Sequence, residues 1–203
     1  MNTQASQIKS KDRVRDLAEV YTAEREVNAM LDLLGPVNAN ITATYLEPAC
    51  GNGNFLVAIL ERKLKVIREL KGSAKQAEIE FKILQAAASI HGIDICEENV
   101  LEARLRMKSD VIEFYSEHFN TWKAKPGFYD TLDLILETNV QVGDMLNGTA
   151  GLIITEWKAP KRLHLSRATF RMDDMLQTGG GTKGPLKPVE RMPSKHYQKL
   201  AST

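Results

Sequence analysis

Residues 45–55 read Tyr-Leu-Glu-Pro-Ala-Cys-Gly-Asn-Gly-Asn-Phe, and this stretch decides the expected fold. A short strand candidate, residues 43–46, runs straight into it, and an amphipathic helix follows and ends at Gly72. Gly51 and Gly53 have no Cβ atoms, so a ligand can approach the backbone of this turn closely. In open α/β sheets, ligands bind at such junctions between a strand and a helix. The stretch therefore predicts a ligand-binding turn in an α/β protein.

The flanking sequence continues the alternation of helices and strands. A helix is expected over residues 16–34, where Gly35 and Pro36 stop it. Further along, helices are expected over 74–89 and 97–119 and strands over 90–95, 140–142 and 152–155, while 130–136 fits either a helix or a strand. This order predicts an α/β fold with a mostly parallel sheet covered by helices.

Composition places the chain among ordinary globular proteins. Its 203 residues include 43% hydrophobic and 26% charged residues, which excludes a wholly disordered chain and a collagen. The two cysteines, Cys50 and Cys96, are too few for a disulfide framework and lack metal-ligand spacing. No apolar run reaches the roughly 18 residues of a membrane span, and the polar N-terminus does not resemble a signal peptide. We therefore expect a reduced, cytoplasmic protein that is not membrane-bound and holds no metal.

The C-terminal segment differs from the rest in charge and composition. Residues 178–203 carry a net charge of +4, which leaves −3 for residues 1–177. Three consecutive glycines and three prolines in this segment argue against a packed core. The expected organisation is one domain over residues 1–177 and a basic, disordered tail over 178–203. The tail suits either an anionic partner or a purely solubilising role.

Glu47 at the end of the first strand restricts the kind of ligand that the turn would accept. A carboxylate there suits a cationic or hydrogen-bond-donating group and repels phosphates. A dinucleotide fingerprint also needs a third glycine, where this chain has Leu56. A nicotinamide-dependent oxidoreductase is therefore disfavoured, and a plain structural turn with glycines is the other interpretation.

Residues 47–56 resemble the S-adenosylmethionine-binding signature of DNA adenine-N6 methyltransferases, usually Asp-Pro-Ala-Cys-Gly-Ser-Gly-x-Phe-Leu. Three further segments resemble that family in the same order. Residues 19–23 are similar to its Gly-Glu-Val-Phe-Thr-Pro segment, residues 90–95 to its second strand, and residues 139–146 to its third motif. The resemblance implies a Rossmann-like class I methyltransferase fold, a mostly parallel sheet with helices on both faces, and S-adenosyl-L-methionine as cofactor.

The resemblance also implies roles for individual residues. Asp94 would bind the ribose hydroxyls, Ile95 would pack on adenine, and Asp144 would bind the exocyclic amine. Tyr21 and Thr22 would close over the methionine end, although Tyr21 equally suits a core position. The implied cofactor-binding residues are Tyr21, Thr22, Glu47, Ala49, Cys50, Gly51, Gly53, Asn54, Phe55, Asp94, Ile95, Asp144 and Met145.

Three of these side chains also have structural interpretations. An acid directly after a strand often caps the following helix or lies in a solvated loop, and this applies to both Asp94 and Asp144. Cys50 has no adjacent base and is expected to be a small buried residue of the turn.

The catalytic motif of the family is missing. Active members carry Asn/Asp/Ser-Pro-Pro-aromatic after the fourth strand, where this chain reads Thr155-Glu156-Trp157-Lys158. Aligned with the motif, Glu156 takes the place of its polar residue and is therefore the one candidate catalytic residue. We favour the alternative interpretation, in which Glu156 is a surface residue and Trp157 packs against the protein. Two functions follow: a methyltransferase acting on DNA, or a catalytically silent subunit, decoy or regulator in a restriction-modification or phage-defence setting.

The number of residues after the last expected strand limits how the chain could recognise DNA. Only 48 residues follow Thr155, too few for a target-recognition domain. Contact with DNA is therefore expected to be weak and nonspecific, or to depend on a partner subunit. A restriction-modification or phage protein partner and a homo-oligomer both remain open.

Overall fold

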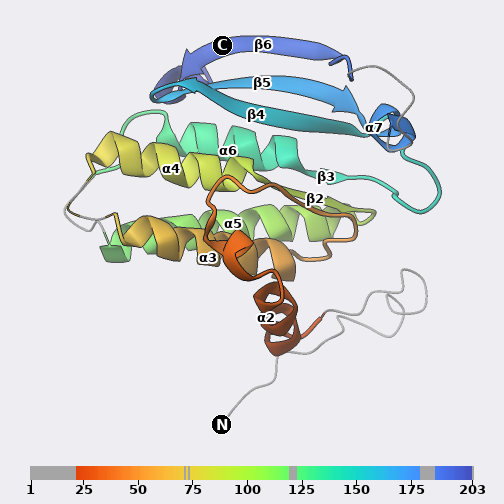
Figure 1. Ribbon diagram of the computed structural model, residues 1–203, viewed down its shortest axis with the longest axis horizontal. Coiled ribbons are helices and arrows are strands. Elements are labelled where there is room, and N and C mark those ends of the chain that lie inside the picture. Colours follow the sequence, from red (N-terminus) through yellow and green to blue (C-terminus); the bar gives the residue numbers. More distant parts are fainter. Residues whose placement is uncertain (1–21, 71, 73, 119–122, 179–185, 203) are drawn as a thin grey trace.

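The computed structural model describes residues 22–70, 72, 74–118, 123–178 and 186–202, and these form three layers (Figure 1). The middle layer holds a parallel sheet, sheet A, together with helices α4 (Gln76–Ala88) and α6 (Phe128–Asn139). Helices α3 (Asn54–Arg68) and α5 (Glu97–His118) lie on one side of it. A second sheet, sheet B, lies on the other side, and α2 (Glu24–Asp32) and the short helix η1 (Gly35–Ala39) lie beside α3.

Sheet A contains three parallel strands in the order β1 (Tyr45–Glu47), β2 (Ile90–Asp94) and β3 (Val140–Val142). Glu47 is in register with Gly92, and Asp94 with Val142, so the carboxyl ends of all three strands form one edge. The pairing continues past β3, where the Gly143 N–H donates to the Asp94 carbonyl at 2.9 Å. This edge therefore collects the residues that follow each strand.

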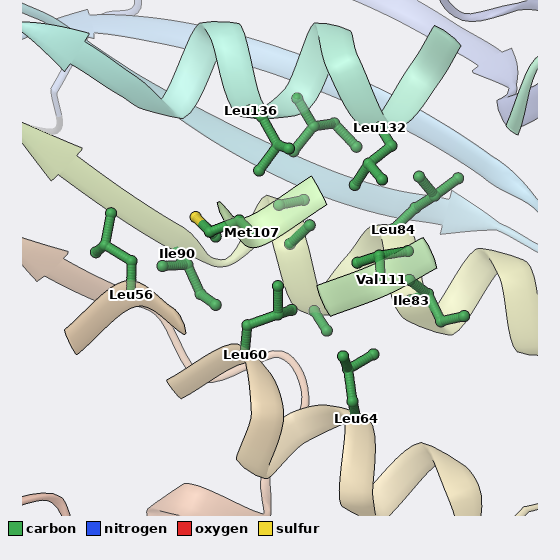
Figure 2. Close-up of a cluster of buried hydrophobic side chains, with 14 of the residues drawn as sticks. Leu56, Leu60, Leu64, Ile83, Leu84, Ile90, Met107, Val111, Leu132 and Leu136 are labelled. Atoms are coloured by element: carbon green, nitrogen blue, oxygen red, sulfur yellow. The ribbon is translucent and has the colours of Figure 1, made fainter. Parts of the chain in front are cut away.

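The main core lies between the middle layer and the α3–α5 layer (Figure 2). Apolar residues at helical spacing on α3 point into it, and Leu56, Leu60 and Leu64 are each at most 3% exposed. The other labelled side chains converge on them from four elements: Ile83 and Leu84 of α4, Ile90 of β2, Met107 and Val111 of α5, and Leu132 and Leu136 of α6. Burying each such side chain contributes about 1.5–3 kcal/mol, so this core holds α3 and α5 against sheet A.

Sheet B is antiparallel, in the order β4 (Ile153–Lys161), β5 (His164–Arg171) and β6 (Glu190–His196). The α/β class is confirmed, but the expected fourth parallel strand begins β4 and pairs with β5 instead. The expectation of helices on both faces is wrong for the described residues, because sheet B covers one face. Along β4, buried Thr155 lies between half-buried Ile154 and exposed Glu156, a pattern typical of an antiparallel sheet with one solvated face.

The described part of the expected disordered tail is folded, which corrects the boundary at residue 178. Residues 190–196 form β6, and Tyr197 in the short helix η2 (Tyr197–Lys199) is fully buried. The Thr131 hydroxyl donates to the Tyr197 carbonyl at 2.6 Å. A Cβ at Gly127 would collide with the carbonyl of Gln198, so this end of the chain packs tightly against α6. Residues 179–185 and 203 lie outside the described residues.

The remaining expected elements are confirmed with shifted ends. The ambiguous residues 130–136 lie within α6, and a short helix α7 (Met172–Thr178) follows β5. The helix expected from residue 16 is α2 in its described part, and residues 16–21 lie outside that part. No helix in the described segments is long and apolar enough to cross a bilayer.

Candidate functional site

The glycine turn after β1 has a backbone that only glycine adopts readily. Gly51 and Gly53 have φ angles of +52° and +91°, in the left-handed region. A Cβ on Gly53 would lie 2.8 Å from the Cβ of Ala103 in α5, well inside van der Waals contact. Gly53 is thus required both for the turn and for the close approach of α3 to α5, a structural role that stands beside any role in ligand binding.

Asp94, at the end of β2, fastens this turn to the start of α5. Its Oδ2 accepts the Gly51 N–H at 2.8 Å, and its Oδ1 accepts the Cys96 N–H at 2.9 Å and the Asn99 amide at 3.3 Å. A carboxylate offers about four acceptor positions. Asp94 therefore combines the expected capping role with remaining capacity for a ligand hydroxyl.

Cys50 is a buried residue of the glycine turn and connects it to β2. Its N–H donates to the Ile93 carbonyl at 2.9 Å, and its side chain is 6% exposed. A Cβ on Gly92 would lie 3.0 Å from its Sγ, so the glycine makes room for the thiol. Burial, followed by the charges of Asp94 and Glu47, raises the pKa of the Cys50 thiol to about 12. The expectation that Cys50 is a small buried residue of the turn is confirmed.

Glu47 and Asp144 complete the set of acids at this edge. One Glu47 oxygen accepts the Ala49 N–H at 3.3 Å. Asp144 Oδ1 accepts the N–H groups of Asn147 and Leu146, each at 2.9 Å, and Oδ2 accepts the Asn147 amide at 2.7 Å. The Asn147 hydrogen bonds, with that of Leu146, lower the pKa of Asp144. The three strand ends thus carry Glu47, Asp94 and Asp144 along one edge.

Asn54, the first residue of α3, connects the turn to two distant segments. Its Nδ2 donates to the Thr22 carbonyl at 2.9 Å, which places Thr22 against the turn. Its Oδ1 accepts from Arg106 of α5 at 2.8 Å, and Arg106 also donates to the Asn52 carbonyl at 2.8 Å. Arg106 could not be predicted from the sequence, because it is 52 residues from Asn54 and no local pattern marks that contact.

The other expected cofactor residues are distributed around this edge. Ile95 is 54% exposed directly after Asp94, whereas Met145 packs on a small cluster of Ile93, Leu152 and Met172. Phe55 is half-buried against the main core, and Ala49 is exposed. The expected residues thus lie at or beside the carboxyl ends of the three strands, and Tyr21 lies outside the described residues.

The structure separates Glu156 from this edge. β4 starts at the carboxyl half of β3, where the Gln141 side chain donates to the Ile153 carbonyl at 2.8 Å. From there β4 runs towards the amino-terminal end of β3, as the hydrogen bond from the Trp157 indole to Oδ1 of Asn139 at 2.8 Å indicates, since Asn139 precedes β3. Glu156 therefore lies on the amino-terminal side of sheet A and forms a surface ion pair with Lys158 at 3.0 Å. This geometry agrees with the interpretation of Glu156 as a surface residue and of Trp157 as a packed side chain.

Comparison of the chain with protein-family models, with curated proteins and with solved structures finds no match. In the part of the chain that the structure describes, no cluster of three or more histidine, cysteine or acidic side chains could hold a metal ion. The interpretation of the site therefore depends on its own geometry.

Proposed function

We propose that the chain binds S-adenosyl-L-methionine at the carboxyl edge of sheet A. The observation that carries this proposal is the position of Glu47, Asp94 and Asp144: the first two end β1 and β2, and the third follows β3 at the same edge. Gly51 and Gly53 keep the backbone beside this edge free of side chains. Open α/β sheets bind their ligands in this position.

The chemistry of the cofactor suits this set of side chains. It has an ammonium group, a ribose diol and an exocyclic amine, all of which are donors, and Glu47, Asp94 and Asp144 would accept from them in that order. Each carboxyl group keeps acceptor capacity beyond its internal hydrogen bonds. Exposed Ile95 offers an apolar surface for the adenine ring. The bound cofactor would supply an electrophilic methyl group on a sulfonium cation, which an acidic edge attracts.

Methyl transfer to DNA adenine further requires a group that accepts hydrogen bonds from the target amine. In the family this group follows the fourth strand, but here Glu156 lies on sheet B and pairs with Lys158. This observation favours the second candidate function, a catalytically silent cofactor-binding subunit, decoy or regulator in a restriction-modification or phage-defence setting.

Calorimetric titration tests the binding. S-adenosylmethionine is expected to bind more tightly than S-adenosylhomocysteine, which lacks the sulfonium charge, and a nicotinamide dinucleotide is expected to give no heat. Asp144→Asn should weaken binding about tenfold or more, because it removes a charged acceptor. Asp130→Asn, an exposed acid on α6, is the matched control and should leave affinity unchanged. No heat with S-adenosylmethionine would refute the proposal.

Transfer of a tritiated methyl group to unmethylated DNA separates the two candidate functions. A silent subunit incorporates no label above the level without protein. Incorporation that disappears in Glu156→Ala would instead establish an active enzyme with an unusual acceptor site.

A further inference from the structure

A cavity of about 750 Å³ lies between sheet B and the amino-terminal side of sheet A, away from the glycine turn. Its walls come from β4 and β5, from the end of α4 and from Thr42 and Thr44 before β1. The volume is within the roughly 300–1,000 Å³ of small-molecule sites. The cavity therefore has the size to hold a ligand of its own.

The sheet B side of the cavity is largely apolar. Ile154, Leu165 and Phe170 line it from the strands, and Leu186 lines it from the segment before β6. Leu165 is 1% exposed and belongs to the main core, whereas Phe170 and Ile154 are half-buried. An apolar body placed against these side chains would be removed from water, which favours its binding.

The cavity also carries one uncompensated positive charge. Two cations line it, Lys158 and Arg191, and both are exposed. Lys158 is paired with Glu156 at 3.0 Å, whereas Arg191 has no ion-pair partner among the described residues. A guanidinium group matches a carboxylate with two parallel hydrogen bonds. The Arg191 side of the cavity therefore favours an anionic group over a cation.

The opposite wall is polar but uncharged. The Gln85 amide and the Thr44 hydroxyl have no hydrogen-bond partner within the described part of the chain and can meet a polar substituent. His91 is 4% exposed, and its Nε2 donates to the Thr155 carbonyl at 2.9 Å. Burial lowers the pKa of His91, so its imidazole adds no positive charge to this wall at neutral pH.

We infer that this cavity binds an amphiphilic carboxylate, with its carboxylate on Arg191 and its apolar body against Phe170 and Leu165. An aliphatic acid and an aromatic acid share this chemistry. The inference uses none of the residues of the glycine turn and is independent of the proposed cofactor.

Titration calorimetry of the full chain with decanoate and with 2-naphthoate tests the inference and distinguishes the two sources. At least one acid is expected to bind, and the tighter one identifies the aliphatic or the aromatic class. Decyltrimethylammonium, of similar length and opposite charge, should bind at least tenfold more weakly than decanoate if the acid is aliphatic. Arg191→Gln should weaken the bound acid about tenfold, and Arg171→Gln, an exposed cation of β5 outside the cavity lining, should leave its affinity unchanged.

A second variant tests the location without altering charge. Ala159 is exposed on β4 and lines the cavity, so Ala159→Trp fills space without disturbing the core and should abolish binding. The inference is overturned if neither acid binds at millimolar concentration, if Arg171→Gln weakens binding as much as Arg191→Gln, or if Ala159→Trp binds like the unaltered chain.

Discussion

Glu80 of α4 is fully buried and joins four segments of the chain. Its Oε1 accepts from the Gln76 amide at 2.9 Å, the Tyr115 hydroxyl at 2.8 Å and the Lys125 N–H at 3.0 Å. Its Oε2 accepts from the Tyr197 hydroxyl at 2.5 Å. Burial and then the hydrogen bond to Glu80 raise the pKa of both tyrosines, so both hydroxyls stay protonated as donors.

This geometry predicts unequal costs for two otherwise equivalent substitutions. Tyr197→Phe keeps the buried ring but removes the one donor that Oε2 has among the described residues, and should lower the free energy of unfolding by about 2–3 kcal/mol. Tyr115→Phe leaves Oε1 with the donors from Gln76 and Lys125, and should cost about 1 kcal/mol. For a chain of this size, the Tyr197 variant should lose roughly 4–12 °C in Tm.

Urea denaturation followed by circular dichroism measures both costs, and a double-mutant cycle with Glu80→Gln isolates the pairwise energy. Coupling between Tyr197 and Glu80 of at least about 1 kcal/mol is expected. A Tyr197→Phe cost below about 0.5 kcal/mol, or one smaller than that of Tyr115→Phe, would refute the assignment of Tyr197 as the essential donor, since a surface change has effects of that size.

Three further predictions concern positions on or next to α3 and α5. Burial, and after it the charge of Glu61, raises the pKa of Asp110 to about 6. The folded protein therefore binds this proton more tightly than the unfolded chain, and the free energy of unfolding should rise as pH falls from about 7 towards 4. Asp110→Asn should remove this pH dependence and raise the free energy of unfolding by about 1–3 kcal/mol at pH 7.5. Burial lowers the pKa of Lys63 to about 8, so the unfolded chain binds the ammonium proton more tightly than the folded protein does. Between pH 8 and 10 the free energy of unfolding of the unaltered chain should therefore rise relative to that of Lys63→Met. Parallel curves of unfolding free energy against pH for the two proteins would contradict this. Gly53→Ala should lower the free energy of unfolding by about 1–3 kcal/mol in urea titrations, because the new Cβ would collide with Ala103 and would require an unfavourable φ angle. An unchanged urea midpoint would count against the tight turn.

The elements around sheet A could be predicted because their signals are local. Apolar residues at helical spacing mark α3, and Gly51 with Gly53 marks the turn before it. The acids Glu47 and Asp94 end two short strands, and a parallel sheet necessarily brings such ends to one edge. Local pattern and three-dimensional arrangement agree here.

Sheet B could not be predicted in the same way, because its stability depends on distant contacts. β6 contains Pro193 and several charges, and taken alone it looks like a solvated tail. It is held by pairing with β5 and by the Tyr197–Glu80 hydrogen bond, which spans 117 residues. The path of β4, which takes Glu156 away from the glycine turn, depends on the same long-range packing.

Backbone amide chemical shifts on addition of S-adenosylmethionine test most directly whether the three carboxyl groups and the glycine turn form one binding site. The amides of Gly51, Gly53, Ile95 and Asp144 are expected to shift together along a single saturation curve, while Thr155 of sheet B stays unmoved. Unchanged spectra at millimolar cofactor, or shifts confined to sheet B, would contradict the account.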